Sequence, residues 1–166
     1  MTIDLVKLDH VEVIDDETAR VGPGNRWGPV YKTLESAGKM VLGGRVSEVG
    51  VGGFLLGGGI AFTSRQHGWA MDSIRSYEIV LANGTIVNAD QQSHPDLYWA
   101  LRGGGSNFGV VTDFTLETYP RTDVWGGQNI YIFGGMAERR ARLGIKRPFE
   151  FSLLQLTQTA GRIGGM

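Results

Sequence analysis

The chain has 166 residues, enough for one domain of ordinary size with a hydrophobic core. Its 16 lysine and arginine residues nearly balance 17 aspartate and glutamate residues, for a net charge of −1, so we expect no nucleic-acid partner. The absence of cysteine excludes disulfides, thiolate metal ligands and a cysteine nucleophile, and the longest apolar stretch, 49–62, is broken by six glycines and too short to span a membrane.

The first elements along the chain are a hairpin and a helix. Short runs at 11–14 and 19–21, separated by four turn-forming residues, predict two strands. Apolar residues with helical spacing over 27–34 then predict a helix of about three turns. Asn25 stands where an N-cap would lie, and Gly38 stands past the expected helix end.

The next predicted elements are a second hairpin, a short helix and a further strand. The runs 76–82 and 86–89 flank an Asn-Gly dipeptide, which is typical of a tight hairpin turn. Residues 95–102 begin with proline and predict a short helix. The alternating, β-branched run 110–118 predicts another strand. Strands outnumber helices, so the expected fold class is α+β.

The pattern changes beyond residue 120. A basic cluster appears around 139–142, and two further strands are expected near 128–133 and 149–156. These additions are too small to enclose a second core. We therefore expect a domain boundary at 120, with a separate and poorly defined tail over 121–166.

The densest glycine segment runs from Gly43 to Gly59, with eight glycines in 17 positions. Without Cβ atoms, successive backbone N–H groups can converge on phosphate oxygens, which makes 50–59 a candidate phosphate-binding segment. The alternative is a turn between strands in which the glycines allow close packing of the chain. Glycine content alone does not decide between these interpretations.

Better-known motifs are not matched. Leu55 replaces the last glycine of a Rossmann fingerprint, and Met40 follows the single Gly-Lys pair where a Walker A loop needs serine or threonine. Ser106 lacks the pattern of a nucleophile elbow. Asp72 is interpreted as a loop cap or as a contact to a ligand hydroxyl. We expect no metal site, because the three histidines are far apart in the chain: His10, His67 and His94.

Three stretches of the chain carry a family resemblance. They are VGPGNRWGPVYKTLESAGKMVLGGRVSEVGVGGFLLGGGIAFTSRQHGWAMDSI, YEIVLANGTIVNA and HPDLYWALRGGGSNFGVVTDFTLETYP. In this order they resemble the flavin-dependent oxidases of the vanillyl-alcohol oxidase type, particularly the berberine-bridge-like branch. The resemblance implies that 1–120 is the second lobe of a PCMH-type FAD-binding domain, with mixed or antiparallel strands and short helices. It also implies that 121–166 starts a truncated substrate domain.

FAD is the cofactor that the resemblance implies, with its diphosphate lying against glycine-rich main chain. The first lobe and the substrate domain with its catalytic base are expected outside this chain, so no catalytic residue is named. The implied FAD contacts are Arg45, Val46, Ser47, Val49, Gly50, Val51, Gly52, Gly53, Gly57, Gly58 and Gly59, with Gly109, Val110 and Val111 toward the adenine end.

The sequence differs from some family members in the residues that bind the flavin covalently. Some members attach the flavin covalently through a histidine, and neither His10 nor His67 matches that motif. Some members add a bond through a cysteine, whose place is held here by Val46, so that bond is chemically impossible.

The function expected from the resemblance is that of an FAD-linked oxidoreductase. Hydride would pass from a small-molecule substrate to the flavin, and oxygen would take the electrons. The alternative is a catalytically incomplete fragment or remnant that binds FAD weakly or not at all. For the chain alone we expect a Kd no tighter than tens of micromolar, about −6 kcal/mol. Exposed strand edges would favour self-association. A β-rich interaction module without cofactor is a third class, and the compartment is left open.

Overall fold

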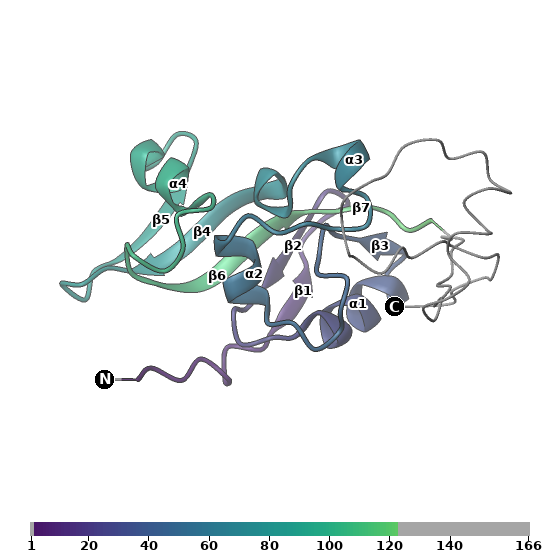
Figure 1. Ribbon diagram of the computed structural model, residues 1–166, viewed down its shortest axis with the longest axis horizontal. Coiled ribbons are helices and arrows are strands. Elements are labelled where there is room, and N and C mark those ends of the chain that lie inside the picture. Colours follow the sequence, from purple (N-terminus) through teal and green to yellow (C-terminus); the bar gives the residue numbers. More distant parts are fainter. Residues whose placement is uncertain (1, 123–166) are drawn as a thin grey trace, which may run out of the picture. The chain divides into compact units, whose positions relative to one another are not determined.

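A five-stranded antiparallel sheet organises the described residues, which in this computed structural model are 2–122 (Figure 1). Neighbouring strands pair antiparallel throughout this sheet. Their order across the sheet is β1 (Val11–Val13), β2 (Thr18–Val21), β6 (Val110–Glu117), β4 (Ile74–Val80) and β5 (Ile86–Asp90). A second, two-stranded sheet pairs β3 (Lys39–Met40) with β7 (Tyr119–Pro120).

Short helices accompany the strands. They are α1 (Trp27–Ser36), α2 (Val51–Leu56), α3 (Ser64–His67), the 3-10 turn η1 (Ala70–Ser73) and α4 (Pro95–Leu101). The predicted α+β class, both predicted hairpins and the helices expected at 27–34 and 95–102 are confirmed. The strands expected at 128–133 and 149–156, and the tail beyond 122, lie outside the described residues. The boundary at 120 stays a prediction.

The hydrophobic core lies between the central strands and the helices. Strand β6 is central, between β2 and β4, and buries Phe114 and Leu116. Helix α1 buries Trp27, Val30 and Leu34 along the apolar stripe that predicted it. Helix α2 adds a shorter stripe to the same core: Val51, Leu55 and Leu56.

The turn of the β4–β5 hairpin differs in detail from the expected Asn-Gly turn. Gly84 adopts φ 83°, whereas Asn83 does not have a positive φ. The Gly84 amide donates to the Leu81 carbonyl at 2.9 Å, and the Leu81 amide donates to the Thr85 carbonyl at 2.9 Å. Of the two residues in the dipeptide, only the glycine therefore has a left-handed conformation. This is typical of hairpin loops in which a turn is followed by one left-handed residue.

The expected N-cap role of Asn25 is wrong. Arg26 occupies the cap position of α1, with no side-chain cap hydrogen bond. The Asn25 side chain is buried, and its Nδ2 donates to the carbonyls of His10 at 3.0 Å and Gly22 at 3.2 Å. Asn25 thus ties the residues before β1 to the turn after β2. Gly38 does lie past the helix end, with φ 69°.

Helix α2 and the β3–β7 pair were not predicted. In α2, glycines stand at two of six positions and interrupt the apolar periodicity from which helices are recognised. Strands of two residues, as in β3 and β7, are too short to show alternation.

Asp15 holds the turn between β1 and β2. Its Oδ1 accepts hydrogen bonds from the backbone N–H of Glu17 at 2.8 Å and of Thr18 at 2.7 Å, and from the Thr18 hydroxyl at 2.9 Å. Because these bonds, with the Glu17 N–H first, favour the charged carboxylate, they lower the pKa of Asp15.

A lowered pKa in the folded state makes stability depend on pH in one direction. The stabilisation is present above the unfolded-state pKa of about 3.9 and is lost as the pH falls through the folded-state value. We therefore expect Asp15→Asn to flatten the loss of stability on acidification from pH 5 to pH 2, measured by urea unfolding at stepped pH. Asp9→Asn is the control, because Asp9 accepts no hydrogen bond from residues 2–122. Parallel pH curves for wild type and Asp15→Asn would contradict this role.

Candidate functional site

The glycine-rich region is anchored against the start of α1. Residues 45–53, here called the amide segment, run into α2 beside an isolated antiparallel bridge between Arg26 and Gly50. The Trp27 amide donates to the Val49 carbonyl at 3.1 Å, and the Gly28 amide donates to the Ser47 carbonyl at 2.9 Å. The carbonyls of Ser47 and Val49 are thereby directed toward α1.

Most N–H groups of the amide segment remain without an acceptor. The Val51 amide donates to the Asn25 carbonyl at 2.9 Å, and the Val49 amide donates to the Val46 carbonyl at 3.2 Å. The first amides of a helix have no intrahelical acceptor, which accounts for Gly52 and Gly53. Within the described part of the chain, seven backbone amides of the segment lack an acceptor: those of Arg45, Val46, Ser47, Glu48, Gly50, Gly52 and Gly53.

The glycines fall into two groups when a Cβ atom is placed on each. At Gly50 and Gly53 a Cβ would meet nothing within 4 Å, so the space beside these residues is open. At Gly59, which has φ 71°, a Cβ would lie 2.5 Å from the Phe54 ring, and at Gly58 φ is 100°. The fold requires Gly58 and Gly59, whereas packing within the described residues does not require Gly50 or Gly53.

The close-packing interpretation applies to part of the glycine-rich sequence, and phosphate binding by the rest stays a prediction. Gly57 and Gly58 donate their amides to the carbonyls of Gly53 and Leu55, which closes the end of α2. The carbonyls of Gly58 and Gly59 accept the amides of Met71 and Ala70. Close packing therefore explains Gly58 and Gly59. The amide segment differs because most of its N–H groups have no acceptor among residues 2–122.

The sequence-predicted residues of the second glycine-rich loop belong to the sheet. A Cβ on Gly109, which has φ 154°, would lie 2.4 Å from the Val80 carbonyl oxygen. Val110 and Val111 pair with Val80 and Ile79 across β4 and β6. The loop that precedes them touches α2, because the Gly105 amide donates to the Leu56 carbonyl at 3.0 Å. The two glycine-rich loops thus meet at the end of α2.

The amide segment carries one arginine and one glutamate, and Arg26 beside it makes the local charge positive. Arg45 is exposed, and its side chain makes no ion pair with any of residues 2–122. Glu48 is partly neutralised by Arg26, whose Nη1 lies 3.6 Å from Glu48 Oε2 and donates to the Glu48 carbonyl at 2.5 Å. One unpaired guanidinium beside seven unpaired amides makes this surface suited to an anion.

Trp27 supports the chain that leads into the segment. It is 0% exposed, stacks on Tyr31 with ring centroids 5.7 Å apart and meets the edge of Phe54 at 5.2 Å. A Cβ on Gly43 would lie 2.3 Å from the Trp27 ring, and one on Gly44 would lie 2.6 Å from it. Gly43 and Gly44 are therefore glycines because an indole packs against their backbone.

Tyr31 fixes the same stretch by a hydrogen bond. Its hydroxyl donates to the Gly44 carbonyl at 2.7 Å. Burial raises the pKa of the Tyr31 hydroxyl, so it remains a donor at all ordinary pH values. Residue 44 is thereby held one position before the amide segment begins.

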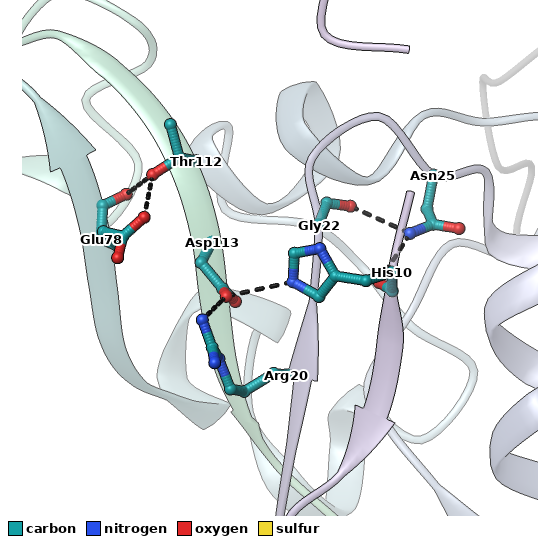
Figure 2. A network of polar contacts seen from close by, with 7 residues as sticks. All are labelled: His10, Arg20, Gly22, Asn25, Glu78, Thr112 and Asp113. Carbon is teal, nitrogen blue, oxygen red and sulfur yellow. Dashed lines mark hydrogen bonds and ion pairs between the residues drawn. The ribbon is translucent and has the colours of Figure 1, made fainter. Parts of the chain in front are cut away.

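A separate polar network surrounds Asp113 on β6 (Figure 2). The Asp113 side chain is 5% exposed, and its Oδ2 accepts a hydrogen bond from Arg20 and lies 3.0 Å from His10 Nε2. Asp113 Oδ1 is buried and has no partner among the described residues. Thr112 donates to Glu78 Oε1 at 2.6 Å beside this network. These contacts could not be predicted from the sequence, because His10 and Asp113 are 103 positions apart.

Removing Arg20 tests what this network contributes. Arg20→Ala would leave the Asp113 carboxylate buried with His10 as its remaining partner, so we expect the free energy of unfolding to fall by about 1.5–3 kcal/mol, the cost of losing a hydrogen bond to a charged group. Adding Asp113→Asn removes the poorly compensated charge. The double variant should therefore be more stable than Arg20→Ala alone in urea unfolding. A further loss of stability in the double variant would contradict this assignment.

The other sequence candidates have structural roles. Asp72 caps η1, since its Oδ2 accepts the Trp69 amide at 2.8 Å, and its Oδ1 pairs with Arg102 at 2.5 Å. The His67 ring packs against Tyr119, with centroids 4.1 Å apart. Over residues 2–122 no three His, Asp or Glu side chains are grouped so that they could hold a metal ion. No helix in that range is long and apolar enough to cross a membrane.

The described fold and site define a class: an antiparallel α+β unit with a glycine-rich segment in which several backbone amides lack an acceptor among residues 2–122. Comparisons with known proteins identify its family. The family model of the FAD binding domain matches residues 1–90. The FAD-dependent monooxygenase tpcD of Cochliobolus heterostrophus is 53% identical over 134 residues, which are 80% of this chain and 26% of that protein.

Solved structures agree with the sequence matches. Xylooligosaccharide oxidase from Myceliophthora thermophila superposes with a TM-score of 0.71 at 40% identity, over 76% of this chain and 27% of that one. Glucooligosaccharide oxidase from Acremonium strictum, which carries a 6-S-cysteinyl, 8α-N1-histidyl FAD, superposes with a TM-score of 0.70 at 31% identity, over 78% and 28% of the two chains.

The chain belongs to the FAD-binding domain family, among the flavoproteins of the vanillyl-alcohol oxidase and berberine-bridge-like type. It corresponds to the FAD-binding part of flavin-dependent oxidases and monooxygenases, and FAD is the cofactor of the family. The chain spans about a quarter of the length of the curated relatives that it matches.

Proposed function

We propose that the amide segment holds the diphosphate of FAD, and that the chain serves as the FAD-binding part of an oxidoreductase. The observation that carries this proposal is the set of seven amides without an acceptor among residues 2–122, with open space beside Gly50 and Gly53. Two phosphates with negative charge supply the acceptors that these N–H groups lack. Arg45 adds a positive charge at the same surface.

The individual residues divide into contacts and supports. Arg45, Val46, Ser47, Gly50, Gly52 and Gly53 offer N–H groups toward the diphosphate. Val49 and Val51 anchor the segment through backbone bonds to Trp27, at the start of α1, and to Asn25 before it. Gly57, Gly58 and Gly59 shape the adjoining end of α2. Gly109, Val110 and Val111 form the proposed adenine side, which the contact between the two loops at Leu56 supports.

FAD, when bound, supplies the hydride-accepting chemistry of the reaction. The described residues contribute binding and orientation. The whole protein would act on a small-molecule substrate and pass its electrons to oxygen. None of the 166 residues is a cysteine, so these residues form no 6-S-cysteinyl bond with the flavin.

Comparison of two flavins tests this assignment. Purified chain is titrated with FAD and with riboflavin, which has the same isoalloxazine ring but no phosphate, and flavin fluorescence is followed. If the amides hold the diphosphate, FAD binds at least tenfold more tightly than riboflavin, which is about 1.4 kcal/mol. Equal affinity for the two flavins would contradict the proposal. An absence of any flavin response would favour the interaction module without cofactor.

A further inference from the structure

The tip of the β4–β5 hairpin carries a sequence with no role in the flavin site. Asn83-Gly84-Thr85 is the single Asn-x-Ser/Thr triplet, with x other than proline, in the 166 residues. This triplet is the acceptor pattern for an N-linked glycan in proteins that enter the secretory pathway. A match of three residues is weak by itself, so its position in the fold decides its weight.

The hairpin tip presents all three residues to solvent. Asn83, Gly84 and Thr85 are each exposed. A Cβ on Gly84 would meet nothing within 4 Å, so no other part of the described chain covers the tip. Figure 1 shows the β4–β5 turn projecting beyond the neighbouring elements, away from α2 and the amide segment. A bulky group attached here meets no obstacle among residues 2–122 and leaves the proposed flavin site open.

The side-chain nitrogen of Asn83 makes no hydrogen bond with residues 2–122. Oδ1 of Asn83 accepts the Thr85 amide at 3.0 Å, while Nδ2 donates to none of the described residues. The Thr85 hydroxyl also makes no hydrogen bond within 2–122. The turn itself requires only an acceptor oxygen at position 83, which aspartate supplies equally well. Neither the amide nitrogen of Asn83 nor the hydroxyl of Thr85 is explained by the fold.

We propose that Asn83 is the acceptor of an N-linked glycan. The donor is an oligosaccharide carried on a lipid diphosphate. A bond forms between Asn83 Nδ2 and C1 of the first sugar, and the bond from C1 to the diphosphate oxygen breaks. The lipid diphosphate leaves with the bonding electrons, and the amide proton passes to a base of the transferase. No oxidant or reductant takes part.

Secretion of the chain from yeast tests this directly. The whole chain is expressed behind a cleavable secretion leader, and both the medium and the membrane-bound cell fraction are collected, so that a poorly folding chain is also counted. Peptide-N-glycosidase treatment in heavy-oxygen water converts any glycosylated asparagine to a heavy-oxygen aspartate, and mass spectrometry locates this mark. Because an Asn-Gly pair also deamidates spontaneously, only a mark that is absent from a mock treatment without the enzyme is counted. We expect one glycan, at residue 83.

Two variants and a control separate the acceptor role from the turn. Asn83→Asp keeps the acceptor oxygen of the turn, and Thr85→Val keeps the β-branched shape, so both should fold and both should lose the glycan. Asn88→Asp changes an exposed asparagine on β5 outside such a triplet and should keep it. An unmodified residue 83 in both fractions, or a glycan that persists in Asn83→Asp, would overturn the proposal.

Discussion

Replacing Gly53 by valine is expected to weaken FAD binding at least tenfold while leaving the unfolding midpoint unchanged. A Cβ at Gly53 meets nothing within 4 Å, so a larger side chain does not clash with the described residues. In a helix, valine is about as favourable as glycine, to within roughly 0.5 kcal/mol. The added methyl groups instead fill the open space beside the unpaired amides. Loss of one or two hydrogen bonds to a charged phosphate costs about 1.5–3 kcal/mol each.

The measurement pairs a flavin titration with a thermal melt of the same protein. Thr33→Val places the same side chain on an exposed position of α1 and should change neither quantity. Gly59→Val should instead destabilise the fold itself, because φ is 71° and the Phe54 ring occupies the space. Unchanged FAD affinity in a well-folded Gly53→Val protein would show that Gly53 does not face the cofactor.

Trp27→Ala should be the most destabilising single change among the core residues. The indole is 0% exposed and contacts Tyr31, Phe54 and the backbone of Gly43 and Gly44. Truncating a buried tryptophan to alanine costs about 3–5 kcal/mol, since it leaves a cavity as well as losing buried apolar area. Urea unfolding followed by circular dichroism measures this loss.

Two further variants refine the expectation for Trp27. Trp27→Phe keeps an aromatic ring and removes Nε1, which is buried without a partner among the described residues, so its cost should be well below that of alanine. Trp99→Ala removes a tryptophan that is 77% exposed and should change stability by about 0.5 kcal/mol or less. A similar loss from Trp27→Ala and Trp99→Ala would contradict the packing described for Trp27.

The elements with a clear periodic pattern could be predicted from the sequence. Helix α1 followed from apolar spacing, and both hairpins followed from alternation around turn-forming residues. The family also followed, because the order of three stretches is specific even though each short motif is weak. Helix α2 did not follow, since its glycines remove the side chains on which periodicity depends.

The glycine-rich segment shows why the site was harder to predict than the fold. In the sequence, Gly53 and Gly59 cannot be distinguished, although one faces open space and the other packs against a ring. The difference comes from the placement of Phe54 and Ala70, which is tertiary information. The Asp113 network depends on tertiary contacts in the same way, because the fold brings His10 and Arg20 to one carboxylate.

The most direct test of the central claim is to observe the amides of the segment while ligand is added. In ¹H–¹⁵N spectra of the labelled chain, FAD and ADP, which share the diphosphate, should shift the amide resonances of Gly50, Gly52 and Gly53. Riboflavin should leave these three resonances in place. If FAD shifts other amides and leaves the three glycines unchanged, the diphosphate is bound elsewhere and the account of the amide segment is wrong.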